Sequence, residues 1–150
     1  MANYLQKQTD KEIIGWNGTC IVHEDFSPIS ILDIREQFQD VVILAHSECP
    51  PDVLDRVDLV GGTSDMVRYV EDNPDKKRFM LVTECGLGER LAIEFPDREF
   101  VGTCALCPYM KSIRLGDILD CLKSPKTYHT IQIDQFIIER ANRAISYILN

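Results

Sequence analysis

No segment of the 150-residue sequence approaches the roughly 20 consecutive apolar residues that a membrane-spanning helix needs. The first seven residues, Met1 to Lys7, also lack the apolar core and the cleavage pattern of a secretory signal. We therefore expect a cytoplasmic protein that does not associate with a membrane.

Basic residues are fewer than acidic residues in this chain. The chain has 16 lysine and arginine residues against 24 aspartate and glutamate residues, for a formal net charge of −8 at pH 7. Nucleic acids and anionic membrane surfaces carry negative charge, so an acidic domain is poorly suited to bind either. Hydrophobic residues make up 45% of the chain, which predicts a folded domain with a core rather than a disordered tail.

Cysteine is the informative residue type in this chain. In a reducing compartment we expect no structural disulfides, so thiols indicate metal binding, catalysis or simple core burial. The only Cys-x-x-Cys pair ends in Cys-Pro, a sequence typical of iron–sulfur ligation, and no second pair exists to complete a four-thiolate zinc site. The six cysteines are Cys20, Cys49, Cys85, Cys104, Cys107 and Cys121.

Short apolar runs alternate with amphipathic, helix-like segments along the whole chain. We expect strands at residues 12–16, 41–45, 58–60, 78–83, 99–101 and 129–133. Helices are expected at residues 28–38, 50–57, 63–70, 88–95, 115–122 and 134–149. This alternation predicts βαβ units, a parallel sheet and a layered α/β fold.

A weak internal repeat accompanies this pattern. Cys20 and Cys107 lie 87 positions apart, and each precedes a predicted helix and then a predicted strand. The spacing indicates small duplicated α/β units, each begun by a cysteine.

Two polar clusters follow predicted strands, where α/β folds place their ligands. Cys20 and His23 could ligate a soft metal, or they could be a loop cysteine beside a surface histidine. His46 and Glu48 could act as an acid–base pair, or the loop could merely start a helix with a capping Ser47 or Glu48.

A third cluster, Gly61-Gly62-Thr63-Ser64, could bind an anion through backbone N–H groups at a helix start. The same residues also suit an ordinary helix N-cap.

In their order along the chain, these clusters resemble the motifs of quinolinate synthases. The family pattern is Gly-x-Cys-x-Val-His, His-Pro-Glu-Cys, Gly-Ser-Thr-Ser-x-Met, Thr-Glu-x-Gly and Cys-Pro-x-Met. The corresponding segments here are 18–23 (GTCIVH), 46–49 (HSEC), 61–66 (GGTSDM), 83–86 (TECG) and 107–110 (CPYM). Five motifs in one order make the resemblance specific, although Ser47 and Gly62 depart from the pattern.

The resemblance implies a fold of three similar αβα units, each a three-layer arrangement with a parallel sheet, around a pseudo-threefold axis. Residues 1–19 would be the tail of a preceding unit, residues 20–105 a complete unit, and residues 106–150 the start of the next unit with a C-terminal helix. The chain would thus be the C-terminal half of such an enzyme, without its N-terminal unit.

The resemblance also implies a chemistry. The family uses a 4Fe–4S cluster held by one cysteine from each unit to condense iminosuccinate with dihydroxyacetone phosphate, losing phosphate and water, into quinolinate for NAD biosynthesis. Cys20 and Cys107 match two of the cluster ligands, and the third is not in this chain. His46 and Glu48 match catalytic and substrate-binding positions, Thr63 matches a substrate-binding position, and His23 would lie close to the cluster.

A missing unit would leave the isolated chain inactive, because two thiolates hold a 4Fe–4S cluster poorly. A complementing N-terminal chain could restore the activity. Apolar surface that meets the missing unit should be exposed, above all on the helix at 134–150.

Two alternative functions stay open. One is a non-catalytic module or degenerate partner half that binds anions or one metal. The other is a zinc domain built from Cys20, His23, Cys104 and Cys107.

Overall fold

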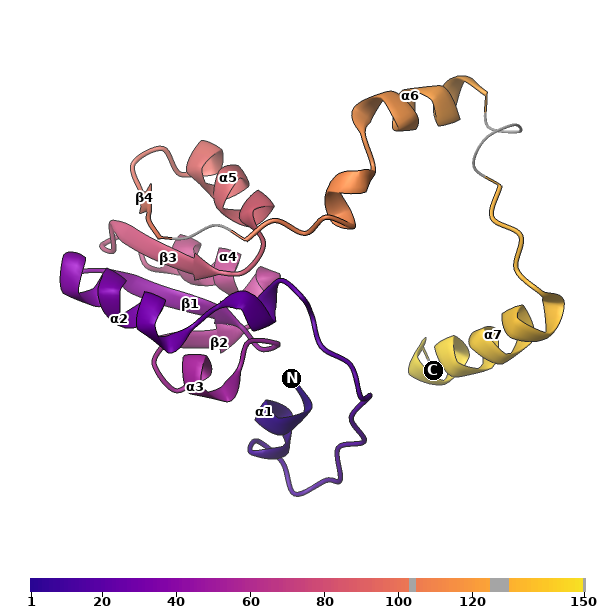
Figure 1. Cartoon of the computed structure of the whole chain (residues 1–150), viewed down its shortest axis with the longest axis horizontal. Helices are drawn as coiled ribbons and strands as arrows, with labels where there is room; N and C mark the ends of the chain where they lie inside the picture. Colours follow the sequence, from indigo (N-terminus) through magenta and orange to yellow (C-terminus); the bar gives the residue numbers. More distant parts are fainter. Residues whose placement is uncertain (103–104, 125–129, 150) are drawn as a thin grey trace. The chain divides into compact units, whose positions relative to one another are not determined.

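The computed structural model describes residues 1–102, 105–124 and 130–149, and the chain divides into two compact units, residues 1–108 and 109–150 (Figure 1). The expected division into a tail at 1–19, a complete unit at 20–105 and a further start at 106–150 stays a prediction.

The first unit is built on a four-stranded sheet in which every strand is parallel, in the order β2–β1–β3–β4. The two central strands are almost completely buried, as expected when helices cover both faces of a sheet. The strands are β1 (Val42–His46), β2 (Leu59–Gly61), β3 (Arg78–Val82) and β4 (Glu99–Phe100).

Helices cover both faces of this sheet, so the unit has the three αβα layers that were predicted (Figure 1). Successive side chains of a strand point to opposite faces, and the core is accordingly split into two clusters. The described helical elements are α1 (Ala2–Gln6), η1 (His23–Asp25, a 3₁₀ turn), α2 (Pro28–Gln37), α3 (Pro51–Leu54), α4 (Thr63–Asp72) and α5 (Cys85–Glu94).

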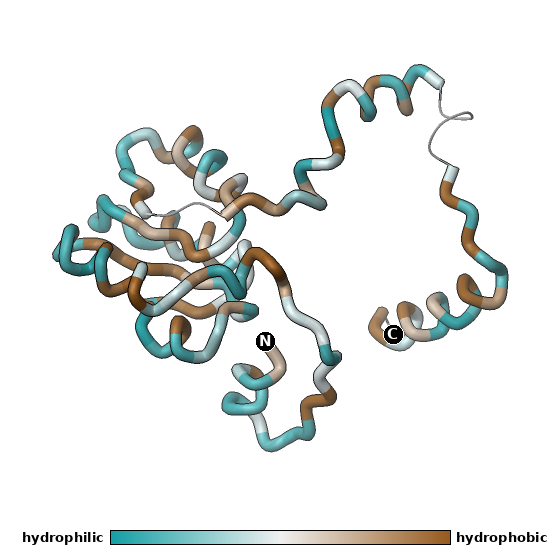
Figure 2. Tube along the Cα trace, viewed as in Figure 1, coloured by the Kyte–Doolittle hydropathy of each residue, from teal (hydrophilic) through white to brown (hydrophobic). Residues whose placement is uncertain are grey.

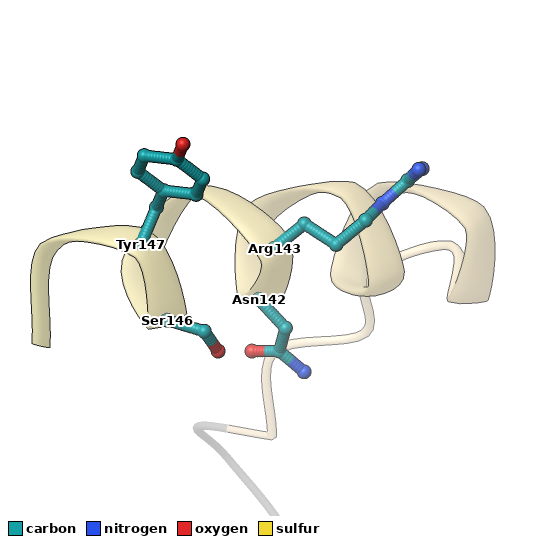
Figure 3. A pocket seen from close by; sticks show the side chains of 4 residues that line it. All are labelled: Asn142, Arg143, Ser146 and Tyr147. Atoms are coloured by element: carbon teal, nitrogen blue, oxygen red, sulfur yellow. The ribbon is translucent and has the colours of Figure 1, made fainter. Parts of the chain in front are cut away.

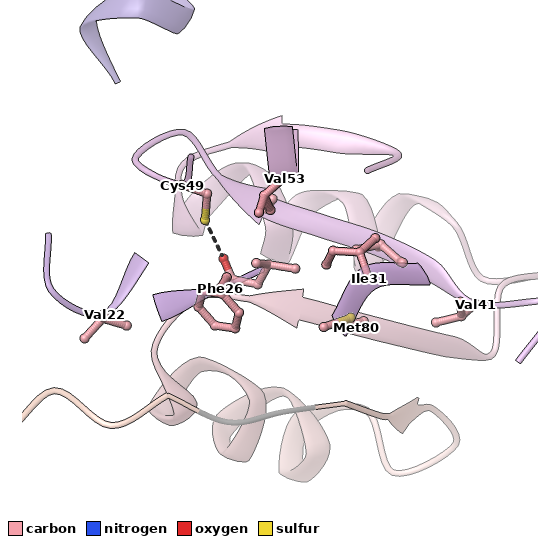
Figure 4. Packing of buried hydrophobic residues seen from close by; sticks show 10 residues of the cluster. Val22, Phe26, Ile31, Val41, Cys49, Val53 and Met80 are labelled. Atoms are coloured by element: carbon pink, nitrogen blue, oxygen red, sulfur yellow. Dashed lines mark hydrogen bonds between the residues drawn. The ribbon is translucent and has the colours of Figure 1, made fainter. Parts of the chain in front are cut away.

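The first cluster joins α2 and α3 to one face, through Ile31 and Val53 against alternate residues of β1 and β3 (Figure 4). The second cluster joins α4 and α5 to the other face, through Met66, Val70 and Leu91. In Figure 2 the strands are accordingly mostly hydrophobic, whereas hydrophobic and hydrophilic residues alternate along the helices.

Two predicted strands are wrong. Residues 12–16 and the described part of 129–133 are irregular. Ile14 and Trp16 are 91% and 92% exposed, and neither segment has a strand beside it in the described part of the chain. An apolar run without a neighbouring strand cannot form ladder hydrogen bonds, so it does not become a strand here.

The second unit contains η2 (Met110–Ser112), α6 (Leu115–Lys123) and α7 (Gln135–Leu149), none of which has a buried residue. Apolar side chains on α7 are exposed; Ile145 and Ile148, for example, are 51% and 83% exposed. That this surface meets a further unit stays a prediction. Among the described residues, no helix combines the length and the apolar character that a membrane crossing requires.

A hollow along α7 is lined by Asn142, Arg143, Ser146 and Tyr147 (Figure 3). These four side chains include no thiol, imidazole or carboxylate. All of the site residues predicted from the sequence belong to the first unit.

Candidate functional site

The candidate residues gather at the carboxyl edge of the sheet in the first unit. His46 is the last residue of β1 and pairs in register with Gly61 at the end of β2. Glu48 follows two residues later, and Thr83 comes directly after β3. Open parallel sheets bind their ligands at this edge, so the topology supports the location predicted from the motifs.

Buried neighbours fix the position of His23. Val22 and Phe26 are 4% and 6% exposed and pack into the first cluster on either side of it. The Glu24 N–H donates to the Cys20 carbonyl at 3.0 Å, which winds the chain into η1. His23 itself is only 7% exposed, so the alternative of a surface histidine is wrong.

The loop that carries Glu48 is anchored on both sides of that residue. The Ser47 N–H donates to the Gly61 carbonyl at 3.0 Å, and the buried Cys49 thiol donates to the Val82 carbonyl at 3.5 Å (Figure 4). Helix α3 begins after Pro50 without a side-chain cap, so the alternative that Ser47 or Glu48 caps it is wrong. The Glu48 side chain remains 38% exposed.

His23 is the hub of a hydrogen-bonded network. Its Nδ1 lies 3.0 Å from Glu48 Oε2, and its Nε2 lies 3.0 Å from Thr83 Oγ1. Its ring stacks on His46, with centroids 4.3 Å apart and planes 8° apart. Glu48 Oε2 is also 3.5 Å from His46 Nδ1, so one carboxylate lies within reach of both imidazoles.

Burial lowers the pKa of His23 below its usual value of 6.5, and the neighbouring His46 lowers it further, against the opposing effect of Glu48. The ring is therefore neutral at neutral pH. A carboxylate only accepts hydrogen bonds, so His23 carries its proton on Nδ1 and donates a hydrogen bond from there to Glu48. Nε2 then accepts from the Thr83 hydroxyl.

Cys20, together with His23 and Glu48 of this network, could also hold a metal ion. Ligand atoms of Cys20, His23 and Glu48 all lie within 4.8 Å of one another. Cys20 and Glu48 further line one cavity of about 920 Å³, together with residues 13–19 and the N-terminal segment. A thiol, an imidazole and a carboxylate at a solvent-accessible cavity form a donor set suited to a transition metal.

Cys107 follows a segment that extends the sheet edge. Ala105 forms an isolated parallel bridge with Glu84, and the Cys85 N–H donates to the Ala105 carbonyl at 3.1 Å. Cys20 and Cys107 are both partly buried cysteines outside any disulfide, and both pack against the first cluster. Their convergence on one cofactor stays a prediction.

The remaining cysteines have other settings. Cys85 is disulfide-bonded, so the expectation that no cysteine would form a disulfide is wrong for this residue. Cys104, which the zinc alternative requires, lies outside the described residues.

The helix start at Thr63 contains a feature that the motif did not predict. Thr63 is the exposed first residue of α4, and the Asp65 carboxylate accepts from the Gly62 N–H at 2.8 Å. Gly62 is the N-cap residue of α4 and makes no side-chain cap hydrogen bond, so the choice between an anion site and an ordinary N-cap stays open. A carboxylate at that position opposes a second anion, because like charges repel.

Thr83 is the site residue that sequence reasoning missed. It belongs to the Thr-Glu-x-Gly motif, but its buried hydroxyl gains a role only through its contact with His23, 60 positions earlier in the chain. A polar residue at the carboxyl end of an apolar strand was the signal available in the sequence.

Comparison with known proteins gives one consistent result. The family described as "Quinolinate synthetase A protein" matches residues 1–150. Similar proteins include a quinolinate synthase of Xylella fastidiosa, 41% identical over 99% of this chain and 43% of that protein, and quinolinate synthase 2 of Mesorhizobium japonicum, 41% identical over 99% and 45%. A quinolinate synthase of Agrobacterium fabrum is 40% identical over 99% and 42%. The chain thus spans about two fifths of the length of these curated relatives.

Proposed function

The chain belongs to the quinolinate synthetase A family, and from that membership we propose that it forms part of an enzyme that makes quinolinate for NAD biosynthesis. The reaction is the condensation of iminosuccinate with dihydroxyacetone phosphate, with loss of phosphate and water. The observation that carries the proposal is the grouping of Cys20, His23 and Glu48 beside His46 at the carboxyl edge of the sheet.

Cys20 and Cys107 are the proposed ligands of a 4Fe–4S cluster. Both are partly buried cysteines outside any disulfide, beside the same hydrophobic cluster, and thiolate donors suit iron–sulfur ligation. With three protein ligands, one of them supplied from outside this chain, a bound cluster keeps an open iron that acts as a Lewis acid. Because the chain offers only part of that ligand set, we expect it to be inactive alone.

Glu48 is the proposed proton acceptor at this site. Its carboxylate lies 3.0 Å from the His23 Nδ1, is partly exposed and lines the large cavity, so a substrate entering that cavity can reach it. His23 holds the carboxylate in place, because its own ring is fixed by Thr83 and by the stacked His46. His46 can donate a hydrogen bond to a substrate carboxylate.

Thr63 is the proposed third substrate contact. It lies at the end of β2, the strand that pairs with the end of β1 at His46. Its hydroxyl is exposed and can donate to a carboxylate or phosphate oxygen. Asp65 should weaken that contact, so we expect Thr63 to contribute through its hydroxyl rather than through the start of the helix.

The experiment is complementation. The chain is co-expressed with the remaining part of the Xylella fastidiosa relative, reconstituted anaerobically with iron and sulfide, and assayed for visible cluster absorption and for quinolinate by chromatography. Cys20→Ala and Cys107→Ala should each remove both signals. Glu48→Gln should leave the absorption intact but remove quinolinate formation.

Cys121→Ala is the matched control, since Cys121 is a free cysteine in α6 and has no proposed role. It should keep both signals. If Cys107→Ala retains the cluster, or if Glu48→Gln makes quinolinate at the unsubstituted rate, the proposed assignments are wrong.

A further inference from the structure

We propose that the chain without a cluster binds one divalent metal ion of the zinc type through Cys20 Sγ, His23 Nδ1 and a Glu48 carboxylate oxygen. This mononuclear site differs from the proposed cluster site, because it uses His23 and Glu48 and does not use Cys107. Three protein ligands leave a fourth position open to water or to a small ligand, which is the arrangement of reactive rather than structural zinc sites.

The distances between the three ligand atoms already approach those around a tetrahedrally coordinated ion. All three ligand atoms lie within 4.8 Å of one another, and His23 Nδ1 is 3.0 Å from Glu48 Oε2. Tetrahedral zinc with bonds of about 2.0–2.3 Å places its ligand atoms roughly 3.3–3.8 Å apart. Shifts of the order of 1 Å therefore suffice, and the ion replaces the proton that His23 and Glu48 now share.

Thr83 holds the ring of His23 in a suitable orientation. With a metal on Nδ1, the neutral ring carries its proton on Nε2, which lies 3.0 Å from Thr83 Oγ1. The hydroxyl can turn from donor to acceptor without moving its oxygen. A ligating histidine that gives its other N–H to a fixed acceptor is the usual arrangement in metal sites.

Charge and access also suit a dication. The Cys20 thiolate and the Glu48 carboxylate balance the two positive charges, and the imidazole is neutral. Cys20 and Glu48 line the cavity of about 920 Å³, which gives an ion a path to both ligands.

The test uses the chain alone, reduced and freed of metal, titrated with Co²⁺ and then with Zn²⁺. We expect one equivalent of Co²⁺ to bind with thiolate-to-cobalt charge-transfer absorption, and Zn²⁺ to displace it. X-ray absorption of the zinc form should give a single sulfur ligand. Cys20→Ser and Glu48→Gln should each weaken binding at least about tenfold.

Two matched controls should bind as the unsubstituted chain does. Cys107→Ser removes the other candidate thiol, and Glu24→Gln removes a carboxylate of η1 that bonds to Thr19 instead of His23. Circular dichroism checks that each variant is folded, and a weakened variant counts only if it is. Equal weakening by Cys107→Ser, two sulfur ligands, or no charge-transfer band would overturn the proposal.

This result is independent of the proposed function. Complementation can fail to yield quinolinate while the isolated chain still binds cobalt through Glu48. Conversely, a complemented enzyme can make quinolinate although the isolated chain shows no cobalt band.

Discussion

Thr83→Val tests the hydrogen-bonded network most directly. Thr83 is 4% exposed, and its hydroxyl lies 3.0 Å from His23 Nε2. Valine has nearly the volume of threonine, so the change removes a hydroxyl without opening a cavity. What remains is an unpaired ring nitrogen in a histidine that is only 7% exposed.

The size of the effect follows from that unpaired nitrogen. Leaving a buried polar atom without a partner costs about 1–3 kcal/mol of unfolding free energy, which is more than the net worth of an ordinary hydrogen bond. Urea unfolding of the metal-free chain, followed by far-ultraviolet circular dichroism, measures the change. Thr63→Val is the control, since Thr63 is exposed and a change there should stay within about 0.5 kcal/mol.

A double-mutant cycle separates this cause from general strain. In a His23→Leu background the nitrogen is gone, so Thr83→Val should cost little or even stabilise. A Thr83→Val effect below about 0.5 kcal/mol in the unsubstituted chain would refute the reasoning. So would an equal effect in both backgrounds, because the hydroxyl would then act through something other than His23.

Four further outcomes are expected. Burial raises the pKa of Cys49 from 9.0 to about 12, so at pH 8 iodoacetamide should modify Cys49 about 1,000-fold more slowly than an unperturbed thiol, as followed by mass spectrometry. The same shift should lower the unfolding free energy as pH rises from 9.0 towards about 12, because the unfolded thiol loses its proton first. Asp65→Ala removes the acceptor of the Gly62 N–H and should cost about 1 kcal/mol in urea unfolding, while Asp65→Asn keeps an acceptor oxygen and should cost less. Gly102→Ala should lower the thermal midpoint, because Gly102 has a φ of +102° and a Cβ there would lie 3.1 Å from the Met80 side chain.

The two central strands of the first unit were predictable because they are buried on both faces. A strand covered by helices on two sides needs apolar residues at nearly every position, so residues 41–45 and 79–82 stand out as continuous runs. The segments 12–16 (EIIGW) and 129–133 (HTIQI) carry a weaker form of this signal, since polar residues or glycine interrupt them. Whether such a run becomes a strand depends on a neighbouring strand, which the local sequence does not encode.

The site was predictable as a set of residues but not as a network. Motif order and the carboxyl-edge rule together assign Cys20, His23, His46 and Glu48 to one place. The stacking of His23 on His46 and the bond from Thr83 depend on how segments up to 60 positions apart meet, and no spacing in the sequence predicts that. Asp65 likewise looks like an ordinary helical residue until its carboxylate is seen on the Gly62 N–H.

The fold of the first unit does not require the hydrogen-bonded network around His23. Burial lowers the pKa of this histidine, which means that the protonated ring is less stable here than in water. Val22 and Phe26 already anchor the segment in the first cluster, so apolar residues at both positions 23 and 83 would complete the packing without any polar partner. Keeping an imidazole there requires Thr83 and Glu48 to satisfy both of its nitrogens, and it fixes a carboxylate at the edge of a cavity next to a thiol. That arrangement keeps Glu48 and Cys20 in place for a ligand, so stability and metal binding should respond differently when His23→Leu and Thr83→Val are combined: the fold should tolerate the pair, and the metal site should not.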